Sequence, residues 1–249
     1  MRKLNDAFVD LMPGHVRQLA GAPEVAIVLY FMVLLWWPDT EYIARLVFGF
    51  AITGVLDAPP IFRSARPNAQ YCRPEELPKT AETYVAELQA RGRFSKHPGQ
   101  DEALRESAVK DISKGFARGP FTKEDVDHMF GEGKWRPLWR FMIWQESGNK
   151  WRPIDDGLDS GSNLCQSTTI RVHTSDPSWI TGVLRLFWKF RNELHSAAAS
   201  MGIPLSMQGG TDDESSAYRW KPVRTDDLPY SVVAYFDHRA GCVRFLVLA

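Results

Sequence analysis

The sequence predicts an α+β fold, because helical and strand patterns occupy different parts of the chain. Helical spacing of apolar residues dominates up to residue 130 and returns over 177–201, whereas 139–154 and 231–248 are rich in β-branched and aromatic residues. With 249 residues, 44% of them hydrophobic, the chain can bury a sizeable core in one large domain or two small ones.

The charges of the chain cancel. Thirty basic residues balance thirty acidic ones, so any attraction for nucleic acid must come from local basic clusters. Three widely spaced cysteines, Cys72, Cys165 and Cys242, match no zinc-ligand spacing and fit a reducing compartment. We therefore expect core thiols and an intracellular protein of the cytoplasm or nucleus.

The N-terminal region, predicted to span residues 1–60, contains two apolar stretches. The first, 25–37, lies between two prolines and is shorter than the roughly 20 residues that a membrane-spanning helix needs. The second, 43–56, contains Arg45 and two glycines. We interpret the pair as two buried elements around a turn and expect no stable membrane association. Anchoring to a membrane through 25–56 is the alternative.

The second region, 61–135, begins with a linker and continues as helices. Five prolines between residues 57 and 80 break regular structure. Helices are predicted over 80–90 and 100–116. Thr122-Lys-Glu-Asp125 has the form of a helix start, and the helix should continue to Phe130.

The third region, 136–249, contains two predicted hairpins. Trp139–Gln145 and Lys150–Ile154 read as strands joined by a tight turn at 147–149, and 231–236 with 243–248 as a second hairpin. Between the hairpins, apolar residues at three-and-four spacing over 177–201 predict an amphipathic helix that packs on a sheet and ends at Gly202.

Two blocks in this third region carry the chemistry. Asp213-Glu-Ser-Ser-Ala217-Tyr218 places a carboxylate, which can hold a divalent cation, five residues before an aromatic ring. Upstream, Gly148-Asn-Lys150-Trp151-Arg152-Pro153-Ile154-Asp155-Asp156 contains two cations on the predicted hairpin. In their order along the chain, the two blocks resemble the fingers and palm motifs of reverse transcriptases, and over roughly residues 115–249 the chain resembles reverse-transcriptase-like open reading frames of protist retroelements.

The resemblance implies a role for each motif residue. Asp213 would be catalytic and, with Glu214, would bind Mg²⁺ or Mn²⁺. Tyr218 would lie under the sugar of the incoming nucleotide, and Lys150 and Arg152 would bind its phosphates. Asp212 is the rival of Asp213 for the metal, and the alternative for this acidic pair is a polar turn after Gly209-Gly210.

The implied activity is template-directed DNA synthesis from dNTPs, on an RNA or DNA template with a primer. An aromatic-x-Asp-Asp block, which supplies further metal carboxylates in that family, does not follow. We therefore expect a fragment with an N-terminal extension, fingers and an incomplete palm sheet, inactive as a polymerase and exposed at the 243–248 edge. Asp155 and Asp156 are expected to support the hairpin. The alternative is a non-catalytic nucleic-acid-binding or interaction protein derived from a retroelement.

Overall fold

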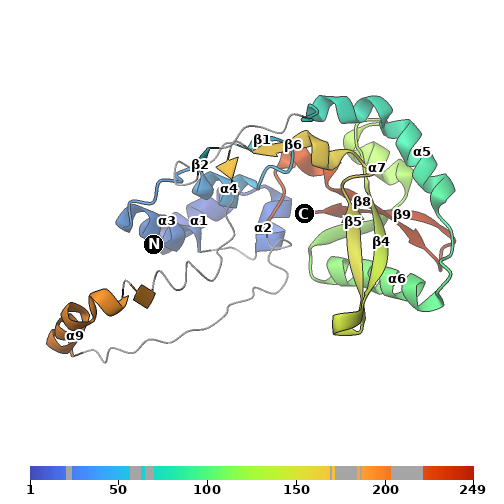
Figure 1. Cartoon of the computed structure of the whole chain (residues 1–249). Helices are drawn as coiled ribbons and strands as arrows, with labels where there is room; N and C mark the ends of the chain where they lie inside the picture. The colour runs from blue at the N-terminus through green and yellow to red at the C-terminus, as the bar shows by residue number, and fades with distance from the viewer. Residues whose placement is uncertain are drawn as a thin grey trace. The chain divides into compact units, whose positions relative to one another are not determined.

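The computed structural model shows a mixed α+β fold, as the sequence predicts (Figure 1). It describes residues 1–20, 24–56, 63–64, 70–168, 170–171, 184–185, 187–202 and 221–249. The chain divides into two compact units, one made of Met1–Ile170 with Ser216–Ala249 and one made of Arg171–Ser215. The division between the units therefore does not fall between residues 57 and 80.

The described helices are mostly short. The α-helices are α1 (Arg2–Leu11), α2 (Gly14–Ala20), α3 (Val25–Leu34), α4 (Tyr42–Phe48), α5 (Ala81–Arg91), α6 (Pro98–Ser113), α7 (Lys123–Phe130) and α9 (Arg191–Ser200). Tighter 3₁₀ turns are η1 (Pro74–Thr80), η2 (Glu146–Gly148), η3 (Ser162–Cys165) and η5 (Thr225–Tyr230). The strands are β1 (Gly54–Leu56), β2 (Arg63–Ser64), β3 (Ala117–Phe121), β4 (Leu138–Gln145), β5 (Lys150–Asp156), β6 (Gln166–Thr168), β7 (Ile170–Arg171), β8 (Val232–Asp237) and β9 (Cys242–Leu248).

Five strands form the main sheet, in the order β3-β9-β8-β4-β5. Strand β4 runs parallel to β8, and the other neighbours are antiparallel. Both predicted hairpins are present, as β4–β5 and β8–β9. The expectation of an exposed edge at 243–248 is wrong, because β3 pairs with β9 on the side away from β8. A smaller parallel sheet joins β1 and β6.

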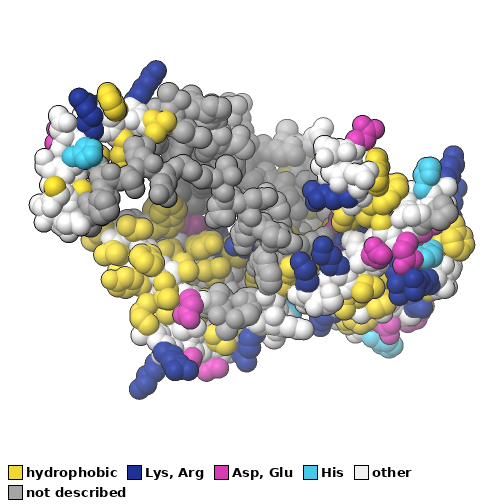
Figure 2. All heavy atoms as spheres, turned by 90° about the horizontal axis from the view of Figure 1, so that it is seen from below, with side chains coloured by type: hydrophobic (Ala, Val, Ile, Leu, Met, Phe, Trp, Pro, Cys, Tyr) yellow, Lys and Arg dark blue, Asp and Glu magenta, His cyan; other side chains and the backbone are white. Residues whose placement is uncertain are grey.

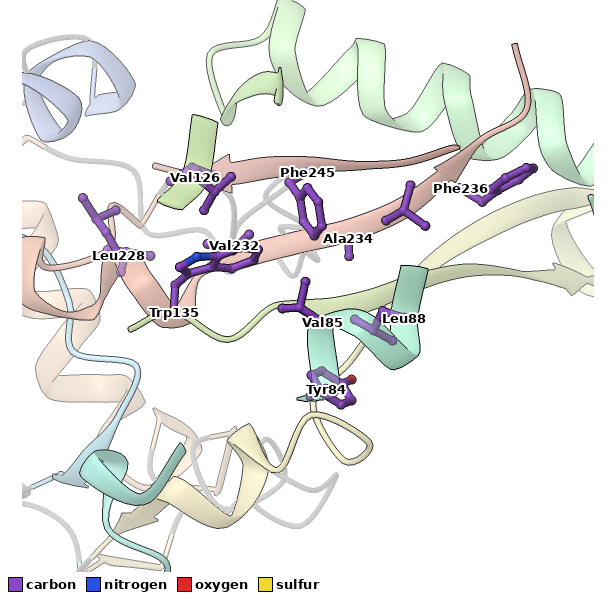
Figure 3. Close-up of a cluster of buried hydrophobic side chains, with 13 residues drawn as sticks. Tyr84, Val85, Leu88, Val126, Trp135, Leu228, Val232, Ala234, Phe236 and Phe245 are labelled. Atoms are coloured by element: carbon purple, nitrogen blue, oxygen red, sulfur yellow. The ribbon is translucent and has the colours of Figure 1, made fainter. Parts of the chain in front are cut away.

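Helices cover both faces of the main sheet, and the alternation along β8 decides which residues face which helix. Val232, Ala234 and Phe236 belong to the core cluster that includes Val85 and Leu88 of α5 (Figure 3). Val233 and Tyr235 point the other way, into a cluster with Leu104 and Ala108 of α6. Because both faces are buried, β8 is apolar at almost every position instead of alternating with polar residues.

The first cluster is centred on an aromatic pair. The Trp135 and Phe245 rings meet edge to face with centroids 5.1 Å apart, and both are fully buried. The indole N–H of Trp135 donates to Asp127 on α7, so this large side chain loses no hydrogen bond on burial. Helix α7 starts as predicted, with Thr122 and Asp125 each accepting a backbone N–H from the other.

The N-terminal apolar stretches form helices, but the prediction that both are buried is wrong. In α3 only Val25 and Ala26 are buried, and Val25 packs with residues of α1, α2 and α4. The following turn is open as well, and Trp36 is 92% exposed. Among the described residues, no helix is long and apolar enough to cross a membrane.

The helix predicted over 177–201 is described from residue 184 onward with a gap, and its first part lies outside the described residues. It ends as expected, with Gly202 at a φ of +68° after α9. Of its described apolar residues, Leu184, Phe187 and Phe190 are exposed.

Candidate functional site

The predicted fingers block, residues 148–156, comprises the end of the turn and the whole of β5, which is the edge strand of the β4–β5 hairpin. The two strands pair without a bulge from Trp139 with Asp156 to Gln145 with Lys150. The reversal at η2 ends in Asn149, whose φ of +45° lies in the left-handed region that asparagine tolerates. The tight turn expected at 147–149 therefore determines the register that places Lys150 and Arg152.

Lys150 and Arg152 project from the same face of β5, because side chains two residues apart share a face of a strand. Both are exposed. Arg152 Nε donates to Gln145 Oε1 at 2.6 Å, and Ile143, opposite Arg152, is partly exposed on this same face. Neither cation forms an ion pair with a carboxylate within the described part of the chain. The face is basic and open to solvent.

The opposite face of the hairpin carries two tryptophans that sequence reasoning did not select. Trp144 and Trp151 are cross-strand partners whose rings meet edge to face, with centroids 5.2 Å apart. Trp151 packs partly against the α6 cluster, whereas Trp144 remains 46% exposed. The predicted hairpin already placed these two tryptophans opposite each other. They were not selected because aromatic residues in strands usually belong to the hydrophobic core.

A buried arginine holds the base of the hairpin. Arg140 on β4 is fully buried and contacts Asp155 on β5 and Asp111 on α6. Burial opposes its charge, but the hydrogen bonds and charges of Asp155 and Asp111 outweigh burial and raise the pKa of Arg140. Asp156 accepts the backbone N–H groups of Leu158 and Asp159. Asp155 thus supports the hairpin, as expected, whereas the bonds of Asp156 stabilise the turn that follows β5.

The predicted palm residues lie outside the described residues: Asp213, its rival Asp212, Glu214 and Tyr218. The next described residue is Lys221. Pro222 and Val223 are buried, with the Pro222 carbonyl accepting the N–H of Phe50 at 2.7 Å and the Val223 carbonyl contacting His15 Nε2 at 2.8 Å. This anchors the segment after the palm block to the N-terminal region. In the described ranges no cluster of histidine, cysteine and acidic residues could hold a metal ion.

The cysteines have three different environments. Cys165 is buried and Cys72 is partly exposed, and the expectation of a core thiol is wrong for Cys242, which is exposed at the start of β9. Burial, together with the neighbouring Cys72 thiol, raises the pKa of Cys165 to about 11. All three are free thiols.

Comparisons with protein-family models, with curated proteins and with solved structures found no match for this chain.

Proposed function

We propose that this chain is the fingers and first palm portion of a reverse-transcriptase-like protein, and that its β4–β5 hairpin binds nucleotide phosphates. One observation carries the proposal: Lys150 and Arg152 stand on the same exposed face of β5, and neither has a carboxylate partner among the described residues. Exposed cations that sit side by side without counter-charges form a local anion-binding surface, which the zero net charge of the chain does not otherwise supply.

The two cations suit phosphate in complementary ways. Arg152 uses its Nε for Gln145, so its two terminal nitrogens can donate a bidentate pair to phosphate oxygens. Lys150 adds a flexible point charge. Two residues of a strand span about 7 Å, so the two cations are close enough to contact one phosphate backbone together. The face can therefore engage either successive phosphodiesters or a triphosphate.

The reverse-transcriptase-like protein of which this chain would be a part would synthesise DNA by two-metal nucleotidyl transfer. Asp213 and Glu214 would bind Mg²⁺ or Mn²⁺, and Tyr218 would contact the sugar of the dNTP. Two-metal transfer needs carboxylates that converge on both cations. We expect no primer extension by this polypeptide, because the further Asp-Asp block is lacking. Incorporation of dNTPs that Asp213→Ala abolishes would show this expectation to be wrong.

Binding of a fluorescent primer–template duplex tests the role of the hairpin. We expect the double variant Lys150→Ala/Arg152→Ala to weaken binding. The negative slope of log K against log salt should also become shallower by about 1 to 2, since each lost phosphate contact reduces its magnitude by about 0.9. The matched control, Lys114→Ala/Arg118→Ala, removes two exposed cations at and before β3, the opposite edge strand. Equal losses in both variants would contradict a specific site.

A non-catalytic nucleic-acid-binding protein is the second candidate. The exposed Trp144 next to the Trp151 ring favours it, because exposed aromatic rings stack on the bases of single strands without chemistry. Metal-dependent binding of a dNTP separates the two functions, since only a working nucleotide pocket requires the metal. Strand binding that persists without any dNTP binding would support this second function.

A further inference from the structure

We propose that helix α3 and the turn after it form an interface at which a second copy of this chain binds. A helix that is apolar on all sides is normally buried. Every residue of α3 is apolar or aromatic, yet only Val25 and Ala26 are buried. Figure 2 shows hydrophobic side chains gathered into broad patches on one face of the molecule. This inference is independent of the proposed function.

The exposed apolar area of α3 and its turn approaches what a dimer buries. Tyr30, Phe31 and Trp37 are each about half exposed and Trp36 almost fully. Because an aromatic side chain offers about 150–250 Å², these four rings alone expose on the order of 500 Å². Val33 and Leu35, each more than two thirds exposed, add to this. A standard interface buries about 800 Å² per partner, and monomers rarely expose apolar patches larger than about 600 Å².

The shape of the surface fits a packed helix. A pocket of about 340 Å³ is lined by Leu29, Met32, Val33, Trp36, Trp37 and Thr40. The first three are spaced at i, i+3 and i+4, which is the stripe that one helix offers to the side chains of another, and Trp36 and Trp37 follow in the turn after the helix. A two-fold axis would bring the same stripe of a second copy against this one, so that each α3 supplies both the protruding side chains and the pocket.

The backbone conformation of Trp36 also indicates a binding surface. The N–H of Trp37 donates to the Met32 carbonyl at 2.8 Å, and Trp36 has a φ of +50°, so α3 ends in the left-handed cap that glycine usually occupies. A bulky residue is strained there, and strained residues persist at binding surfaces where the side chain contributes to function. The indole is 92% exposed in one copy, and it would be buried in a contact between two.

Charge favours a protein partner over a lipid surface. An anionic bilayer is held by basic residues around an apolar patch. The first 50 residues contain four basic residues, Arg2, Lys3, Arg17 and Arg45, against five acidic ones, Asp6, Asp10, Glu24, Asp39 and Glu41. No charged residue lies between Val25 and Trp37, so two copies would meet here without burying a charge.

Sedimentation velocity over about a hundredfold concentration range measures the association directly. We expect a reversible dimer that Val33→Lys and Trp36→Gly each weaken at least tenfold. The control Leu158→Ser replaces a side chain that is equally exposed but lies elsewhere, and should leave the dimer unchanged. Trp36→Gly also separates folding from association, because glycine relieves the cap and should not lower the urea midpoint of the monomer.

Three outcomes would overturn the proposal. The first is a wild-type chain that stays monomeric throughout the range. The second is a dimer that Val33→Lys and Trp36→Gly leave as tight as before, which would place the contact elsewhere. The third is a monomer that floats with phosphatidylcholine vesicles and loses this behaviour on Val33→Lys, which would make a lipid surface the partner of α3.

Discussion

Arg140 and Asp155 face each other directly across β4 and β5, with nitrogen–oxygen contacts of 2.6 and 3.0 Å. A third contact, from Arg140 to Asp111 at 2.8 Å, ties the same guanidinium to α6. The arginine is fully buried, so it links the hairpin to the helix from within the protein. This linkage keeps the basic face of the hairpin in a defined position relative to the rest of the sheet.

Replacing Arg140 with methionine should lower the free energy of unfolding by about 3 kcal/mol, because two largely buried carboxylates lose their shared cation. Urea denaturation of the variant and of wild type measures this loss. Arg118→Met, at an exposed position of β3, serves as the control and should change stability by less than about 0.5 kcal/mol. Similar stabilities for the two variants would mean that the Arg140 network is not structural.

The stability of the first unit should depend on pH through Asp159. Its hydrogen bond from Arg91, at 2.6 Å, and another from Tyr84 hold the pKa of Asp159 below its usual 3.8. Because the pKa of Asp159 is lower in the folded state, its carboxylate stabilises the fold fully above pH 3.8. This stabilisation is lost as the pH falls through the pKa of the folded state. Between about pH 5 and pH 2, wild type should therefore lose more stability than Asp159→Asn.

Above pH 5, Asp159→Asn should be less stable than wild type by roughly 0.5–1 kcal/mol, since the pair with Arg91 is partly exposed. Urea midpoints at several pH values provide the measurement. Parallel pH curves for the two proteins would show that the carboxylate of Asp159 does not couple to folding.

The three thiols should react with iodoacetamide in a fixed order. Cys242 is exposed and should react first, followed by the partly exposed Cys72. Cys165 should react last, because it is buried and its pKa is raised to about 11, which leaves almost no thiolate near neutral pH. Peptide mass spectrometry over time reads out the order. Early labelling of Cys165 in folded protein would contradict this placement.

The helix cap at Thr122 should contribute measurably to stability. Thr122→Ala removes the oxygen that accepts the Asp125 N–H, and should cost about 1 kcal/mol. Thr83→Ala is the matched control, since Thr83 is exposed inside α5, where alanine is the better helix former. Urea denaturation measures the stability of both variants. Equal stabilities would show that the Thr122 cap does not contribute to stability.

Local patterns in the sequence predicted the elements whose signals are complete within a few residues. The Thr122–Asp125 cap and the two hairpins are present because caps, tight turns and strand composition are short-range properties. Strand β3 was missed because Gly119-Pro120 reads as the end of an element. Gly119 lies against the Phe245 carbonyl, where a side chain would clash, so the pairing depends on a contact more than 120 residues away.

The candidate site was predictable to a similar degree. The positions of Lys150 and Arg152 follow from the hairpin register, which the turn at 147–149 determines. The network of Arg140 was not predictable, since Asp111 reaches it from a separate helix. The exposure of α3 was missed for a related reason: composition indicates that a helix needs a partner surface, but not whether that surface belongs to the same chain.

The position of β9 between β3 and β8 has a consequence for the behaviour of the protein in solution. The two outer strands of the sheet are β3 and β5. Pro120 of β3 lacks an N–H, and the register of this strand shifts between Arg118 and Phe121, while β5 contains Pro153 between exposed cations and acids. Neither rim offers an unbroken ladder of free amides to another strand. The sheet should therefore resist fibrillar growth even at high concentration, and the residues proposed to bind phosphate also protect one of its sides.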